Sequence, residues 1–154
     1  MVIYLWAFLI GVTTGLRTLA PLAIVSWAAH LGWLHLENTW LAFLGATVTS
    51  WILSLLALGE LVTDKLPTTP SRKIPIQFGA RIVTGALSGA ALAAPTGGWI
   101  AGVVAGIIGA IVGTLAGAEL RGRLSRVIGN DLPVALLEDV VAIGGALLIV
   151  SRFA

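Results

Sequence analysis

The stretch GWIAGVVAGIIGAIVGTLAGAEL, residues 98–120, is a long apolar run with glycines at helical spacing. About 20 mainly apolar residues in a helix span the hydrocarbon of a bilayer. Helices in lipid gain no hydrophobic energy by meeting, so close backbone contact must supply their attraction. The glycines that would allow this contact are Gly98, Gly102, Gly106, Gly109, Gly113 and Gly117. The stretch therefore predicts a membrane-spanning helix with a smooth packing face.

The composition of the whole chain supports a membrane protein. Hydrophobic residues make up 58% of the 154 residues and charged residues 10%, against roughly 45–50% and 25% in soluble domains. Such a chain cannot cover its core with polar surface, so lipid must cover it. The nine Lys and Arg residues are scattered among apolar segments, which argues against a nucleic acid partner. The absence of cysteine excludes disulfides and thiol catalysis.

The predicted fold is all-α, a single polytopic transmembrane domain over residues 1–154 with about five crossings. Four crossings are expected at 39–59, 74–94, 97–118 and 133–151. The first apolar region, 2–34, would be about 50 Å long as a helix, too long for one crossing and too short for two. We expect it to be broken near Thr13–Pro21, since Gly15 is flexible and Pro21 removes a backbone donor. The sequence leaves open whether this segment is re-entrant or merely kinked.

The charges between these segments predict an orientation. Six of the nine basic residues fall in two alternate connections, 60–75 and 119–133. The positive-inside rule places these connections in the cytoplasm, together with the N-terminus if there are five crossings. Trp33, Trp40 and Trp99 then lie at the outer interface, where tryptophan is enriched.

A glycine-rich partner and a weak repeat are also visible. Gly85 and Gly89 precede the stripe by one short connection, which favours a tight hairpin within the chain; a sliding or homo-oligomeric interface is the alternative. G-x-R occurs at 15–17 and 79–81, and L-A-x-x-E-L at 56–61 and 115–120. These pairs suggest parallel two-helix repeats, 1–62 and 76–120, followed by a fifth helix.

Arg17 and Arg81 lie within apolar sequence. An arginine at mid-bilayer costs at least ~2.5–3.5 kcal/mol, so Arg17 should face the protein interior and meet an acid or an anion. Arg81 is closer to the cytoplasmic side, from which it could snorkel to the headgroups. The acids within reach of these arginines are Glu60, Glu119, Glu138 and Asp139.

Two functions follow from these charges, of which the first is the leading prediction and the second the alternative. In one, the protein is a transporter or flippase for a small anion or anionic lipid headgroup. The anion would bind Arg17, Arg81, Thr14 and Thr18, while the carboxylates couple charge or form salt bridges (Glu60, Asp64, Glu119, Glu138 and Asp139). In the other, the protein is a structural or partner-stabilising membrane module in which the charges form internal salt bridges. A homo-oligomer is expected because five short helices enclose little space.

No catalytic, cofactor or metal site is predicted. Glu60 and Asp64 form an i, i+4 acidic pair, but two carboxylates are a thin ligand set for Ca²⁺ or Mg²⁺. Known enzyme motifs do not occur in the sequence, so we expect no enzymatic activity. The E-x-x-x-D-K of Glu60, Asp64 and Lys65 is similar to the E-x-G-D-[KR] of a cation/proton exchanger family, with Thr63 replacing the glycine. This similarity gives a weaker alternative function.

Four stretches together resemble a known family: GLRTLAPLAIVSWAAHLGWL (15–34), LALGELVTDKLPTTPSR (56–72), GARIVTGALSGAAL (79–92) and LPVALLEDVVAIGGALLIV (132–150). They are similar to the bacterial membrane family called domain of unknown function 4126, over nearly the whole chain. The resemblance implies a small multi-pass protein of the bacterial inner membrane. It implies no activity and no site residues.

Overall fold

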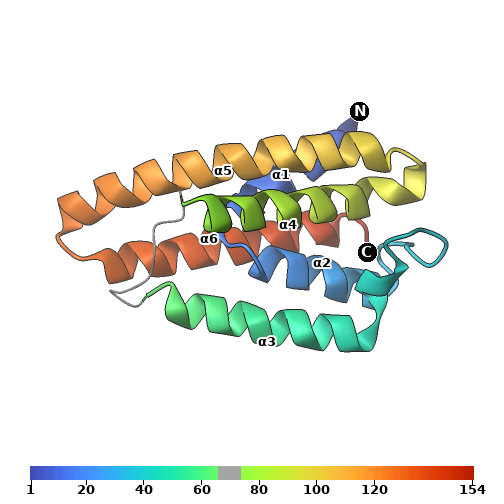
Figure 1. Cartoon of the computed structure of the whole chain (residues 1–154), viewed down its shortest axis with the longest axis horizontal. Helices are drawn as coiled ribbons and strands as arrows, with labels where there is room; N and C mark the ends of the chain where they lie inside the picture. Colours follow the sequence, from blue (N-terminus) through green and yellow to red (C-terminus); the bar gives the residue numbers. More distant parts are fainter. Residues whose placement is uncertain (66–73) are drawn as a thin grey trace.

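The chain folds as a bundle of helices (Figure 1). The computed structural model describes residues 1–65 and 74–154, and all regular elements in these ranges are helical. The elements are α1 (Val2–Leu16), α2 (Ala20–His30), η1 (Ala42–Gly45), α3 (Thr47–Thr63), α4 (Pro75–Ala93), η2 (Ala94–Thr96), α5 (Trp99–Ile128) and α6 (Asp131–Ser151). The predicted all-α class is confirmed. Arg72 and Lys73, which contributed to the predicted orientation, lie outside the described residues.

Lengths and compositions of the helices indicate a membrane protein. In the described part of the chain, three helices are long and apolar enough to span a bilayer: Pro75–Thr96, Trp99–Ile128 and Asp131–Ser151. The other three, α1, α2 and α3, are shorter apolar helices. The polytopic prediction is thus supported, but the count of five crossings does not follow from these lengths.

The glycine stripe of α5 packs within the chain, as the hairpin interpretation predicted. Gly85 of α4 approaches Gly106, and Gly89 approaches Gly102, so the two helices run antiparallel. A Cβ atom added at any of these four glycines would lie within 3.0 Å of backbone or side-chain atoms of the facing helix. Glycine is required here because the two backbones are in contact.

The same stripe also packs against α1, which the sequence did not predict. Gly11 approaches Gly106, and Gly15 approaches Ala110, so α1 runs parallel to α5. Gly15 therefore allows α1 to pack closely against α5. The sequence had predicted a different role for it, namely flexibility at the break. Since α1 and α4 both contact α5, these three helices form the tightly closed centre of the bundle.

The expected break between the first two helices is confirmed at Arg17–Leu19. Arg17 has an extended backbone (φ −136°, ψ 125°), and Pro21 lies in the first turn of α2. The break reverses the chain, so α2 runs back toward the end of the bundle at which α1 begins (Figure 1), and it packs mainly against α3 and α6. The two helices are about 22 Å and 16 Å long.

This reversal changes the expected placement of the chain ends. The N- and C-termini lie at the same end of the bundle (Figure 1), and Tyr4 lies against Gly98 at the start of α5. Met1 is therefore at the end opposite Lys65 and Arg121. The prediction that it lies on the side of the basic connections is wrong, because α1 and α2 run in opposite directions. Periodicity alone does not tell a kink from a reversal.

The second predicted segment, 39–59, begins eight residues too early. Residues 39–46 form a turn and η1, and α3 then continues to Thr63. Leu41 and Leu44 are buried in the core cluster, and the Thr39 hydroxyl accepts a hydrogen bond from the Leu41 N–H at 3.2 Å. Core burial and this local hydrogen bond hold the segment out of the helix.

Helix α5 is longer than the predicted segment 97–118 and continues to Ile128. The charged stretch 119–128, interpreted as a loop, contains no proline, and the helix ends only at Gly129, in the left-handed region (φ 80°). Asn130 then caps α6 by accepting a hydrogen bond from the Leu132 N–H. The predicted segments 74–94 and 133–151 agree with α4 and α6 to within about two residues.

The two ends of the bundle differ in chemistry. At the end with the termini, the Trp40 and Trp99 rings meet edge to face, with centroids 5.5 Å apart. Trp33 packs there against a buried cluster that includes Leu34, Leu36, Leu41 and Leu44. These three tryptophans were predicted to share one end. The basic residues of α5 lie at the other end, where α5 turns into α6 (Figure 1).

The directions of the helices are compatible with the proposed repeat. Helices α2 and α4 both start at the end where α5 meets α6, and α3 and α5 both return to it (Figure 1). A duplication of 1–62 and 76–120 requires two hairpins with the same orientation, here α2–α3 and α4–α5. Helices α1 and α6 lie outside these paired hairpins. The duplication itself stays a prediction.

Candidate functional site: a buried ion-pair network

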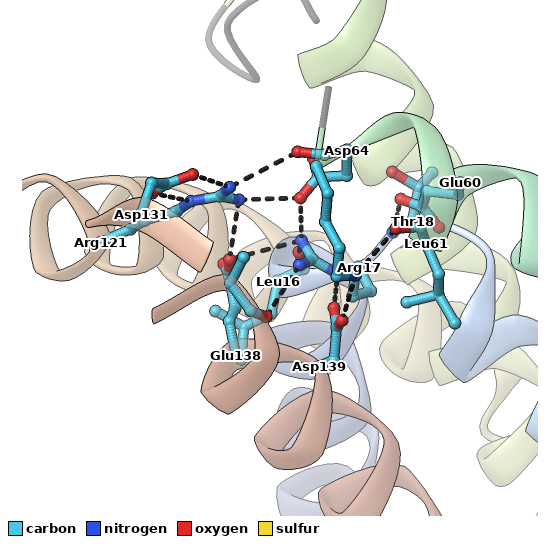
Figure 2. A network of polar contacts seen from close by, with 12 residues as sticks. Leu16, Arg17, Thr18, Glu60, Leu61, Asp64, Arg121, Asp131, Glu138 and Asp139 are labelled. Atoms are coloured by element: carbon cyan, nitrogen blue, oxygen red, sulfur yellow. Dashed lines mark hydrogen bonds and ion pairs between the residues drawn. The ribbon is translucent and has the colours of Figure 1, made fainter. Parts of the chain in front are cut away.

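Arg17 is the largest fully buried side chain in the described part of the molecule. Each of its three guanidinium nitrogens contacts an acceptor of the chain itself. Nε pairs with Asp139, Nη1 lies 2.8 Å from Asp64 Oδ2 and 3.4 Å from Glu138 Oε2, and Nη2 donates to the Ala135 carbonyl at 3.3 Å. Figure 2 shows the side chain surrounded by these carboxylates. The prediction that Arg17 faces the interior and meets acids agrees with this geometry.

A second arginine, Arg121 of α5, joins the same carboxylates. Its Nη1 lies 2.8 Å from Asp64 Oδ2 and 3.2 Å from Glu138 Oε2, so both acids bridge the two arginines. Nε and Nη2 of Arg121 also contact both oxygens of Asp131, at 3.0 and 2.6 Å (Figure 2). This two-pronged contact fixes the guanidinium at the junction of α5 and α6.

Lys65 completes the network from the end of α3. Its Nζ lies 2.5 Å from Asp139 Oδ2 and donates to the Leu61 carbonyl at 2.8 Å. Asp139 therefore bridges Arg17 and Lys65. Together with Asp64, Lys65 ties the end of α3 to α1 and α6.

Among the residues that the structure describes, the network is nearly balanced in charge. These residues supply three cations and four carboxylates: Arg17, Lys65, Arg121, Asp64, Asp131, Glu138 and Asp139. Removing charges from water costs several kcal/mol per ion unless each is paired and hydrogen-bonded. The contacts described meet that condition for Arg17. The arrangement therefore joins α1, α3, α5 and α6 at one end of the bundle.

Glu60 accepts hydrogen bonds from the backbone at the break between α1 and α2. Its Oε1 accepts a hydrogen bond from the Thr18 N–H at 2.6 Å, and its Oε2 accepts one from the Leu19 N–H at 2.8 Å (Figure 2). The break frees these two donors just before α2 begins. A carboxylate at a helix N-terminus also favours the helix dipole. Glu60 thus caps α2 from a neighbouring helix.

We expect Glu60→Ala to destabilise the fold by about 1–3 kcal/mol, because two partly buried N–H groups lose their acceptors. Glu60→Gln should lose less, since the amide oxygen still accepts one bond. Unfolding titrations in mixed detergent micelles measure the difference. Glu119→Gln is the matched control, with an expected change below about 0.5 kcal/mol. Equal losses in Glu60→Ala and Glu119→Gln would contradict the capping role.

Arg81 is buried rather than extended toward the headgroups, with 2% of its surface exposed. Its Nη1 donates to the Gly15 carbonyl at 2.7 Å, an acceptor at the end of α1. The Arg81 side chain therefore does not snorkel to the lipid headgroups. Instead Arg81 ties α4 to the break between α1 and α2.

The threonines near the break are also engaged within the fold. The Thr14 hydroxyl donates to the Gly11 carbonyl of its own helix at 2.7 Å and is fully buried. Thr18 contributes its backbone N–H to Glu60, as described above. Thr18 also lines a pocket of about 290 Å³ whose wall includes Gln77, Arg81 and Glu60. Of the residues predicted to bind an anion, Thr18 and Arg81 therefore share one pocket.

Glu119 lies apart from the network, contrary to the expectation that it would pair with a buried arginine. It pairs with Arg123 on the exposed surface of α5, with Oε1 2.7 Å from Arg123 Nε. The reason is helix rotation, because the glycine stripe points inward and Glu119 lies on the other side of α5. The four other acids predicted to carry charge coupling or salt bridges (Glu60, Asp64, Glu138 and Asp139) gather near the break.

Sequence reasoning missed three members of the network: Lys65, Arg121 and Asp131. The basic residues among them were interpreted as loop charges that set orientation. A signal was present for Arg121, which follows Gly113 and Gly117 at intervals of four residues. Continuing the inward-facing stripe by one more turn would have placed Arg121 on the buried side of α5.

Fold and site together define a class: a small polytopic helical membrane protein with a buried ion-pair network at one end. The chain belongs to the family described as Domain of unknown function (DUF4126), which matches residues 5–152. The resemblance noted from the sequence is thereby confirmed. No curated protein and no solved structure matches the chain.

Proposed function

We propose that this protein is a structural membrane module that stabilises partner proteins by packing against them in the membrane. In this proposal its buried charges stabilise its own fold. The observation that carries this proposal is the saturation of Arg17. Each of its nitrogens contacts a carboxylate or carbonyl of the chain. An anion would have to displace these acceptors, which are held at the end of α3 and in α6.

The closed centre of the bundle supports the same proposal. The backbones of α1, α4 and α5 touch at glycines, so a solute has no path between these helices unless they separate. In contrast, the outward faces carry many exposed large apolar side chains, as on α3 with Trp51, Leu55 and Leu58. A module of this kind acts through the surfaces it presents to lipid and to other membrane proteins.

A second candidate function, a carrier for a small anion, is favoured by the pocket beside the break. Thr18, Gln77 and Arg81 line this pocket, together with the carboxylates of Glu60 and Asp64, and broken helices often build the substrate sites of transporters. In this candidate the anion site lies at Arg81 rather than Arg17. The cation/proton exchanger alternative is less favoured, since Asp64 and Lys65 are both engaged in the ion-pair network.

We further place the protein in the bacterial inner membrane, with the network end facing the cytoplasm. This follows from the positive-inside rule applied to Lys65, Arg121, Arg123 and Arg126. Both termini would then face the periplasm. Homo-oligomer formation stays a prediction from the small size of the bundle.

Flux measurements separate the two candidates. Liposomes that contain the protein should take up labelled phosphate and chloride no faster than protein-free liposomes if the protein is a structural module. A carrier should give faster uptake, and Gln77→Ala should abolish it without changing the melting temperature. Flux with that sensitivity would overturn the structural proposal.

A further inference from the structure

Two opposite charges line one pocket from different helices. The pocket beside the break has a volume of about 290 Å³ and lies between α3, which contributes Glu60, and α4, which contributes Arg81. Thr18 and Leu19, at the break itself, form another part of its wall. In the described part of the chain, Glu60 forms no ion pair, either with Arg81 or with another cation. The pocket is therefore dipolar, with its two charges apart.

The carboxylate of Glu60 has room for a further donor. Its two hydrogen-bond partners, the N–H groups of Thr18 and Leu19, carry no net charge. Each carboxylate oxygen has a second lone pair that can accept another hydrogen bond. Asp64 lines the same pocket but already contacts Arg17 and Arg121. An ammonium group at Glu60 would neutralise its charge and donate to it.

The guanidinium of Arg81 is a fixed positive group on the other wall. Only 2% of the residue is exposed, and its Nη1 donates to the Gly15 carbonyl at 2.7 Å. A carbonyl holds the guanidinium in place without cancelling its charge. Because arginine is the side chain best suited to phosphate recognition, a phosphate is the complementary group on this side of the pocket.

The position of the pocket along the helices fits a lipid headgroup. Thr63 at the end of α3 and Gln77 in the first turn of α4 both line it. The pocket therefore lies where these two apolar helices reach the network end of the bundle. Leu56 and Ala80, which are exposed, contribute apolar wall. Polar and apolar lining at this level matches the boundary between headgroups and hydrocarbon.

We propose that this pocket binds a group that carries both an ammonium and a phosphate, such as the headgroup of phosphatidylethanolamine. The ammonium donates to Glu60, and the phosphate accepts from Arg81. A ligand with an anion alone would add a third negative group beside Glu60 and Asp64. This inference deepens the second candidate function by naming a ligand for the same pocket. It requires binding and no transport, so the flux assay and the binding assay can fail separately.

Nanodiscs of defined composition test this binding, because a ligand that binds the folded state raises the melting temperature. Wild-type protein should melt higher in discs containing phosphatidylethanolamine than in discs of phosphatidylcholine, whose nitrogen has no N–H to donate. Glu60→Gln should lose most of this shift, because it removes the negative charge. Glu119→Gln is the matched control at an exposed carboxylate and should keep the shift.

A second pair of variants leaves the charges in place. Ala80→Phe should also lose most of the shift, since the larger side chain fills the pocket that Ala80 lines. Val83, which is exposed elsewhere on α4, provides the control Val83→Phe, and that variant should keep the shift. Phosphoethanolamine dissolved around phosphatidylcholine discs identifies the source. An equal shift from this ester would assign the pocket to a soluble ligand of the same chemistry.

Two outcomes would overturn the proposal. One is a shift of equal size in discs containing phosphatidylglycerol, which has the phosphate but no ammonium. The other is a phosphatidylethanolamine shift that stays at the wild-type value in both Glu60→Gln and Ala80→Phe. That second result would show that the lipid stabilises the protein from outside the pocket.

Discussion

Arg17→Met should destabilise the fold by about 3–5 kcal/mol, the loss expected when one partner of a buried ion pair is removed. Asp64, Glu138 and Asp139 would be left close together without their central cation. Their mutual repulsion would then act at the junction of the helices. We expect a much lower melting temperature in detergent and loss of the monodisperse species in size-exclusion chromatography.

Arg152→Met is the matched control, because Arg152 is exposed near the C-terminus, and its melting temperature should stay unchanged. Arg17→Lys should lie between the wild type and Arg17→Met, since it keeps the charge but cannot reach three carboxylates with a planar group. A wild-type melting temperature for Arg17→Met would show that the network contributes little to the fold.

Gly106→Val should be comparably damaging, for a steric reason. Gly106 lies where α5 meets both α4 and α1, and an added Cβ atom would lie within 3.0 Å of the Gly85 carbonyl. The obstacle is backbone and cannot rotate away, so the helices must separate. Overpacking costs about 1–3 kcal/mol and occasionally more. We expect a loss at or above the upper end of that range, measured by unfolding in mixed micelles.

Gly122→Ala, in the same helix, is the control. A Cβ atom there meets no other atom within 4 Å. Since alanine favours helix over glycine by about 1 kcal/mol, this variant should be as stable as the wild type or more so. If Gly106→Val were tolerated as well as Gly122→Ala, the close contact of α4 with α5 would be wrong.

The sequence was sufficient to predict the features that depend on local chemistry. Apolar flanks on both sides of Arg17 required a buried partner, and the nearby Pro21 indicated the break. Gly85 and Gly89 were matched to the stripe of α5 because only a short connection separates them. In each case the physical requirement acts within a few residues or between neighbouring helices.

Features that depend on helix rotation and direction could not be predicted in the same way. Glu60 and Glu119 occupy the same position in L-A-x-x-E-L, yet Glu60 caps the break and Glu119 lies on the surface. Glycine packing sets the rotation of α5, and that packing involves α1, which is distant in sequence. For the same reason, the reversal at Arg17 became visible only in the fold.

The central claim is that Arg17 is stabilised by carboxylates of its own chain. A double-mutant cycle of Arg17→Gln and Asp139→Asn, measured by unfolding free energy in mixed micelles, tests this most directly. We predict a coupling free energy of about 2 kcal/mol or more, because the two groups are in direct contact in a buried network. Additive effects, with a coupling below about 0.5 kcal/mol, would contradict the account.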